Sequence, residues 1–123
     1  MLKEAHTVLP AADLERAREF YHQALNLDPD EVVEGNLIYH PSPGIGFEIY
    51  ETPNAGTAKN TQMIWMTDDL DAEMARLRGL GIEFEDFEVP GITTVNGVAT
   101  TGDDRAAWFR DTEGNILCIA ERR

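Results

Sequence analysis

The sequence has one cysteine, no long apolar run and few basic residues. Cys118 has no second cysteine to pair with, so the chain cannot form an internal disulfide, which agrees with a reducing compartment. No apolar run approaches the roughly 20 residues that a membrane span needs, and the opening segment MLKEAHTV has no apolar signal core. We therefore expect a cytoplasmic protein with no membrane partner.

Basic residues are scarce relative to acidic ones: 10 Lys and Arg stand against 23 Asp and Glu, for a formal net charge of -13. Nucleic acids and anionic lipid surfaces would repel such a chain, and no cluster of basic residues offsets that repulsion locally. We expect no nucleic-acid partner. The acidic charge either keeps the protein soluble, which is the simpler explanation, or attracts a cationic small molecule. The sequence also has no nucleophile motif, phosphate-binding loop or dinucleotide fingerprint.

The chain consists of two similar halves. Its length of 123 residues and apolar content of 42% are typical of one compact domain, 1–123, whereas half of it would bury little core. HTVLPAADLERAREFY, which starts at His6, is echoed by QMIWMTDDLDAEMARL, which starts at Gln62. GFEIYE, which contains Glu48, is echoed by ILCIAE, which contains Cys118. The halves, about 1–56 and 57–123, place His6 opposite Gln62 and Glu48 opposite Cys118, and we expect the functional site at the seam between them.

The hydrophobic pattern predicts the same order of elements in each half: a strand, a helix and three strands. Asp13 and Asp69 are the predicted N-caps of helices over 14–26 and 70–78. The glycine-containing connection 88–104 has no counterpart in the first half, and we expect a lid or mobile loop there, or a short extra hairpin. The predicted strands are 4–9, 30–34, 37–40, 46–52, 62–67, 82–87, 105–110 and 116–121.

Alternation along the strands predicts an apolar face under the helices and a more polar, helix-free face that could bind a ligand. Tyr50, Met66 and Trp108 would form an aromatic, adaptable wall, although core packing explains these three nearly as well. We expect His22 on the surface and His40 at a turn, with the cavity rim as the alternative for His40. The predicted ligand-binding residues are His6, Val8, Glu48, Tyr50, Gln62, Ile64, Met66, Trp108 and Cys118.

Two segments resemble the vicinal oxygen chelate superfamily, which includes glyoxalases, bleomycin-resistance proteins and extradiol dioxygenases. HTVLPAADLERAREFYHQALNL resembles the opening strand and helix of the family, and FRDTEGNILCI resembles its closing turn and strand. The resemblance covers nearly the whole chain. It implies an α+β fold in which two βαβββ modules form a curved mixed sheet around a cavity. Because such modules leave open sheet edges, we expect a homodimer.

The resemblance also implies four inward metal-binding positions, which fall on His6, Glu48, Gln62 and Cys118. His6 and Glu48 match the ligands of metal-binding members. Gln62 is a weaker, neutral ligand, and Cys118 stands where glutamate is usual. The set therefore mixes hard oxygen donors with a soft sulfur and suits no common metal well. We expect a degraded site without a cofactor, with a divalent Zn, Ni, Co, Mn or Fe ion as the alternative.

These observations leave three alternatives for function. The first, which we favour, is a metal-independent protein of the bleomycin-resistance type that binds a small cationic or aromatic molecule. The second is a glyoxalase-like lyase, isomerase or dioxygenase that uses His6 and Glu48 with a metal, or Glu48 as a general base without one. The third is a protein whose cavity is filled by side chains and that acts only through partners. Gln62 and Cys118 favour the first alternative over the second.

Overall fold

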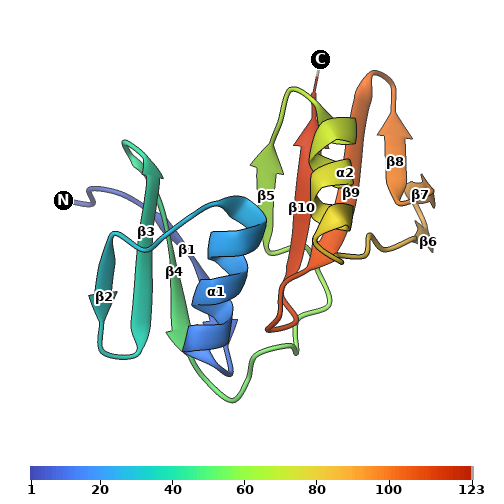
Figure 1. Ribbon diagram of the computed structural model, residues 1–123. Coiled ribbons are helices and arrows are strands. Elements are labelled where there is room, and N and C mark those ends of the chain that lie inside the picture. The colour runs from blue at the N-terminus through green and yellow to red at the C-terminus, as the bar shows by residue number, and fades with distance from the viewer. Residues whose placement is uncertain (123) are drawn as a thin grey trace. The chain divides into compact units, whose positions relative to one another are not determined.

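The structure is a computed structural model that describes residues 1–122, so position 123 of the predicted second module lies outside the described residues. The chain divides into two compact units (Figure 1). Unit 1 contains residues 1–58 and 111–115, and unit 2 contains residues 59–110 and the segment from 116 onward. None of the helices in the described part of the chain has the length and apolar character that crossing a membrane requires.

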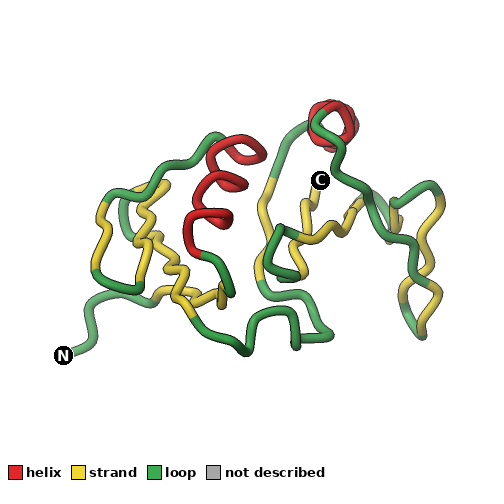
Figure 2. Tube along the Cα trace, turned by 60° about the horizontal axis from the view of Figure 1, so that its bottom comes forward, coloured by secondary structure: helices red, strands yellow, loops and turns green. Residues whose placement is uncertain are grey.

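Unit 1 is a four-stranded sheet that carries one helix. Its elements are β1 (His6–Ala11), α1 (Leu14–Leu25), β2 (Glu31–Val33), β3 (Asn36–Ser42) and β4 (Ile45–Glu51). The strand order is β1-β4-β3-β2, with β1 parallel to β4 and the other pairs antiparallel. Figure 2 shows α1 on one side of these strands. The core of the unit buries Leu9, Tyr21, Leu37, Tyr39, Phe47 and Ile49.

Unit 2 has the same plan with a longer sheet. Its elements are β5 (Met63–Met66), α2 (Leu70–Gly79), β6 (Glu88–Val89), β7 (Ile92–Val95), β8 (Val98–Thr101), β9 (Asp104–Arg110) and β10 (Ile116–Glu121). The strand order is β5-β10-β9-β8-β7-β6, with only β5 and β10 parallel among the described pairs. The buried core includes Leu70, Met74, Leu77, Ala107, Phe109, Leu117 and Ile119.

Both helices begin where the sequence predicts. The Asp13 side chain accepts a hydrogen bond from the Arg16 amide at 3.1 Å, and the Asp69 side chain accepts one from the Ala72 amide at 3.0 Å. Each bond satisfies an amide that has no partner within the first helical turn. Asn26 ends α1 in the left-handed conformation, with φ 56°. The predicted N-caps are therefore confirmed.

The internal repeat extends to the register of the strands. Val8 of β1 pairs with Glu48 of β4, and Ile64 of β5 pairs with Cys118 of β10. The two sequence echoes make Val8 equivalent to Ile64 and Glu48 equivalent to Cys118, so equivalent positions pair in the two units. The two sheets are mixed and open, and together with the helices they confirm the predicted α+β class.

The predicted strand over 82–87 is wrong. Within the described residues this segment contributes only an isolated bridge between Phe84 and Phe109. The position next to β9 is taken by β8, as β2 lies next to β3 in unit 1. Because β8 pairs with Asp104–Ala107 of β9, residues 82–87 reach only the remaining end of that strand, where the Glu85 amide donates to the Trp108 carbonyl at 2.9 Å.

The connection 88–104 contains strands β6, β7 and β8 instead of the loop that we expected, so the hairpin alternative is confirmed. Asn96 and Gly97 join β7 to β8 with φ of 53° and 82°, as a type I′ hairpin turn requires. The Asp86 carboxylate accepts hydrogen bonds from the Gly97 amide and the Thr94 hydroxyl, both at 2.8 Å. These bonds hold the hairpin against the preceding segment.

Candidate functional site

The open face of unit 1, which lies opposite α1, carries four of the predicted ligand-binding residues. Leu9, Phe47 and Ile49 point into the core, so their strand neighbours point the other way. The structure places Val8 and Tyr50 on this face with exposed side chains, and His6 and Glu48 on it partly buried.

His6 and Glu48 are in direct contact. Nδ1 of His6 lies 2.9 Å from Oε2 of Glu48, and Oε1 of Glu48 accepts a hydrogen bond from Nδ2 of Asn36 at 3.1 Å. The hydrogen bond that His6 donates to Glu48 raises the pKa of His6, and the same bond lowers the pKa of Glu48. A lowered pKa makes a carboxylate a weaker base. This environment suits Glu48 to orienting His6 better than to abstracting a proton.

Two further residues join this pair: Glu4, which the sequence analysis did not assign to a site, and His40, for which it gave the cavity rim as the alternative. Nε2 of His6 lies 2.8 Å from Oε1 of Glu4, and the His6 and His40 rings meet edge to face with centroids 5.3 Å apart. Candidate ligand atoms of Glu4, His6 and His40 all lie within 4.8 Å of one another. The sequence signals for this cluster were present: an acidic residue two positions before His6, and a histidine at the end of a strand of the same sheet.

Unit 2 contains a cleft of about 260 Å³ on the side of its sheet opposite α2. Cys118 and Trp108 are cross-strand partners on β10 and β9, and both line the cleft. The Trp108 indole donates a hydrogen bond to Oγ1 of Thr61 at 2.9 Å and meets the Phe87 ring edge to face. The residues that give the cleft its apolar surface are Ile64, Ile92, Ala99, Ala106, Trp108 and Ala120.

The structure separates the predicted residues of unit 2 by environment. Ile64, Trp108 and Cys118 line the cleft, whereas Met66 has an exposed side chain and does not. Gln62 accepts a hydrogen bond from the Ile116 amide at 2.9 Å. Burial raises the pKa of the Cys118 thiol to about 11, so the sulfur is protonated at neutral pH. The contribution of Ile92 was missed because the sequence predicted a loop there.

The segment FRDTEGNILCI has a structural role in unit 1. Its turn, residues 111–115, is organised by Asp111, whose Oδ1 accepts the amides of Glu113 and Asn115 at 2.9 Å each. The hydroxyl of Tyr21 donates to the other oxygen of Asp111 at 2.7 Å. Burial raises the pKa of Asp111 against these bonds. Nδ2 of Asn115 donates to the Pro10 carbonyl at 2.9 Å, which fastens the turn to β1.

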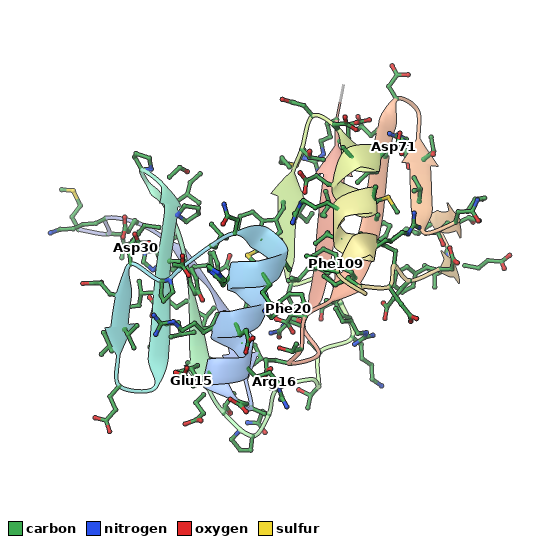
Figure 3. The ribbon with its side chains drawn as sticks, in the orientation of Figure 1. Glu15, Arg16, Phe20, Asp30, Asp71 and Phe109 are labelled. Carbon is green, nitrogen blue, oxygen red and sulfur yellow. The ribbon has the colours of Figure 1, made fainter. Side chains whose placement is uncertain are left out.

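Glu113, in the same turn, binds the backbone immediately before α1. Its buried carboxylate accepts the amides of Ala12 and Asp13, both at 2.9 Å, and pairs with Nε of Arg16 at 2.8 Å. Figure 3 shows Arg16 in the first turn of the helix. Burial alone would raise the pKa of Glu113, but the bonds from Arg16, Asp13 and Thr112 outweigh it and lower the pKa to about 2. The carboxylate therefore stabilises unit 1 and is not available for catalysis.

A larger depression, of about 480 Å³, lies along α1. Its lining is charged, and the first-turn residues Glu15 and Arg16 that border it are labelled in Figure 3. It has no apolar wall, so it is a poor site for an organic ligand. The remaining charged residues that line it are Asp13, Arg18, Glu19, His22 and Asp28.

Comparisons with solved structures place this fold among known proteins. A glyoxalase/bleomycin resistance protein from Catenulispora acidiphila matches with a TM-score of 0.70 and 18% identity, covering 99% of this chain and 100% of that one. TnmS3, an antibiotic binding protein from Streptomyces sp. CB03234, matches with a TM-score of 0.71 and 22% identity, over 100% and 99%. The fosfomycin resistance protein FosX from Listeria monocytogenes, complexed with Mn(II) and sulfate, matches with a TM-score of 0.73 and 14% identity, over 100% and 92%. At these identities the likeness is one of fold.

Comparison with curated proteins finds no match. The sequence does match one family model, over residues 3–119, which is nearly the whole of it. The repeat of two mixed-sheet units agrees with that match. The chain belongs to the Glyoxalase/Bleomycin resistance protein/Dioxygenase superfamily.

Proposed function

We propose that this protein binds a small aromatic molecule, preferentially a cationic one, in the cleft of unit 2. The observation that carries the proposal is the cleft itself: an aromatic ring, Trp108, lies among small and aliphatic side chains in a volume of about 260 Å³. The charged residues of the lining are Asp104, Arg105 and Arg122, so the preference for a cation rests on the net charge of the chain, -13. Ligand sites are typically concave and mostly apolar, with volumes from about 300 Å³ upward, so this cleft suits a ligand of modest size. The structural neighbour TnmS3 is an antibiotic binding protein, and this supports the proposal.

We also propose that the four family positions hold no catalytic metal. Both oxygens of Glu48 are engaged, one by His6 and one by Asn36. The side-chain oxygen of Gln62 is bound to the Ile116 amide. Cys118 offers a soft sulfur where the other donors are hard oxygens. This donor set does not fit a metal ion, and no step of the proposed function depends on one.

The proposal further describes a cytoplasmic homodimer. The edge strand β2 leaves Val32 and Val33 exposed, and open, apolar strand edges are normally paired or covered. The single, buried thiol of Cys118 suits a reducing compartment. Light scattering at micromolar concentration that gives only the mass of one chain would contradict the dimer.

Binding of two dyes of opposite charge tests the proposed function. Proflavine is a cationic aromatic probe and 8-anilinonaphthalene-1-sulfonate an anionic one, and the binding of each is followed by fluorescence. The acidic chain should bind proflavine more tightly than the anionic dye. Added salt screens charge, so it should reduce the difference between the two affinities. A dissociation constant of about 1 mM corresponds to a binding free energy of only about 4 kcal/mol. If proflavine does not bind even at that concentration, the proposal is contradicted.

A matched pair of variants locates the site. Ala120→Leu fills the cleft, because Ala120 lines it and is nearly buried. Tyr50→Ala changes the repeat-equivalent position, which is exposed on the open face of unit 1. We expect Ala120→Leu to weaken proflavine binding at least tenfold and Tyr50→Ala to leave it unchanged. The reverse pattern would move the site to unit 1.

A second candidate function, a metal-dependent lyase, isomerase or dioxygenase, is favoured by one observation. Glu4, His6 and His40 bring a carboxylate and two imidazoles together in unit 1. This function requires that turnover of a hemithioacetal or a catechol appear only in metal-loaded protein and disappear in His6→Ala. Activity in the metal-free protein, or none after loading, would exclude it.

A further inference from the structure

Three neighbouring strands of unit 1 place two histidines on either side of a glycine. His6 of β1 is the register partner of Gly46 of β4. On the other side of β4, Tyr39 of β3 pairs with Phe47, so the next residue of β3, His40, lies beside Gly46. The two imidazoles meet over the glycine with their centroids 5.3 Å apart. Glu4 reaches the same point from the segment before β1, with Oε1 2.8 Å from Nε2 of His6.

Gly46 leaves the space between these donors open. A Cβ atom built on Gly46 would lie 2.8 Å from Nε2 of His6 and 3.2 Å from Nδ1 of His40. The absent side chain would thus stand against one nitrogen of each ring. Gly46 does not have a positive φ, so its backbone does not itself require glycine. The glycine is explained by the convergence of the two rings.

The surrounding contacts orient both rings. Glu48 accepts a hydrogen bond from Nδ1 of His6 at 2.9 Å, which directs Nε2 toward Glu4 and His40. Metal-binding histidines typically donate their other ring nitrogen to a carboxylate in this way. The Asp30 carboxylate, labelled in Figure 3, accepts the backbone amide of His40 at 2.6 Å and fixes the end of β3.

We propose that unit 1 binds one divalent transition-metal ion, of the Zn²⁺, Co²⁺, Ni²⁺ or Cu²⁺ class, through Glu4, Nε2 of His6 and His40. Two imidazoles and a carboxylate are donors that these borderline ions accept, and Mg²⁺ or Ca²⁺ would prefer oxygen ligands alone. The ion takes the place of the contact between Nε2 of His6 and Glu4. Three protein ligands leave a coordination position for water or a small anion. Glu48 is a positioning residue, and Gln62 and Cys118 take no part.

This site is separate from the cleft on which the proposed function rests, because all of its residues belong to unit 1. Either proposal can therefore fail without the other. The test uses the full chain, purified without a metal-affinity tag and freed of metal by chelation. Zn²⁺ is titrated by calorimetry, and Co²⁺ by its visible absorption.

We expect one equivalent of Zn²⁺ to bind. His40→Ala should weaken the affinity at least a hundredfold, and Glu48→Gln, which changes only an orienting contact, about tenfold to a hundredfold. Gly46→Ala removes no donor yet places a methyl group against both rings, so it should also weaken binding at least tenfold. If His40→Ala fails to fold, Gly46→Ala still decides the question.

Control variants separate this site from the alternatives. His22→Ala removes another histidine that pairs with a carboxylate, since Nδ1 of His22 lies 2.9 Å from Asp28. We expect His22→Ala, Gln62→Ala and Cys118→Ala to bind Zn²⁺ like the parent. Loss of binding in Gln62→Ala or Cys118→Ala would assign the ion to the family positions and overturn the proposal. Unchanged binding in His40→Ala and Gly46→Ala, or no binding by the parent at about 1 mM Zn²⁺, would overturn it as well.

Discussion

Removal of the Glu113 carboxylate should destabilise unit 1 although Glu113 lies far from α1 in the sequence. In Glu113→Ala the amides of Ala12 and Asp13 lose their acceptor and Arg16 loses its partner. A hydrogen bond to a charged group contributes about 1.5–3 kcal/mol. The Arg16 side chain is 52% exposed, so the ion pair adds little beyond these bonds. We expect a loss of about 2–4 kcal/mol in the free energy of unfolding.

The pH dependence of this loss carries a definite sign. The pKa of Glu113 is about 2 in the folded protein and 4.5 in its ordinary state. A group whose pKa is lowered by folding stabilises the folded state above its unfolded pKa, and this stabilisation is lost as the pH falls through the folded value. The difference in stability between parent and Glu113→Ala should therefore be complete at pH 7 and shrink progressively as the pH falls from about 4.5 toward about 2.

Urea unfolding followed by circular dichroism at pH 7 and pH 3 measures this difference. Glu73→Ala is the matched control, because Glu73 pairs with Arg76 at 2.8 Å on the exposed surface of α2. Such a pair contributes about 0.2–1 kcal/mol. The reasoning would be refuted if Glu113→Ala cost no more than Glu73→Ala, or if its effect were the same at both pH values.

Two further substitutions test other parts of the fold. Gly114→Ala should cost more than about 1 kcal/mol in thermal or urea unfolding, because Gly114 has φ 84° and an added Cβ would lie 2.8 Å from the Cα of Gly56; a neutral result would contradict the tight turn. Asp86→Ala should speed amide exchange in β7 and β8 by removing the acceptor of Gly97 and Thr94; unchanged exchange would show that the hairpin does not depend on Asp86.

The repeat explains how much of the fold the sequence predicted. Val8, Glu48, Ile64 and Cys118 pair as the echoes require, because the same spacing of strand and helix buries the same face in both units. The pattern failed at 82–87, where alternation reflected packing beside the sheet. The hydrophobic pattern also did not locate the hairpin turn at Asn96-Gly97, where both residues have a positive φ.

The site was predicted less completely than the fold. Ile64, Trp108 and Cys118 were predicted from strand alternation, and all three line the cleft. Alternation along a strand cannot report contacts made across strands or by chain termini. The contacts of Glu113 with the residues before α1 are of this kind, so sequence periodicity carried no sign of them.

Chemical-shift mapping of the metal-free protein with proflavine tests the central claim most directly, since it reports which residues the ligand touches. The account predicts that the largest amide and indole shifts occur at Ile64, Trp108 and Ala120, which line the cleft of unit 2. The indole N–H of Trp108, which donates to Thr61, should be among the most strongly shifted signals. Shifts confined to the charged surface of α1, or to the open face of unit 1, would contradict the account.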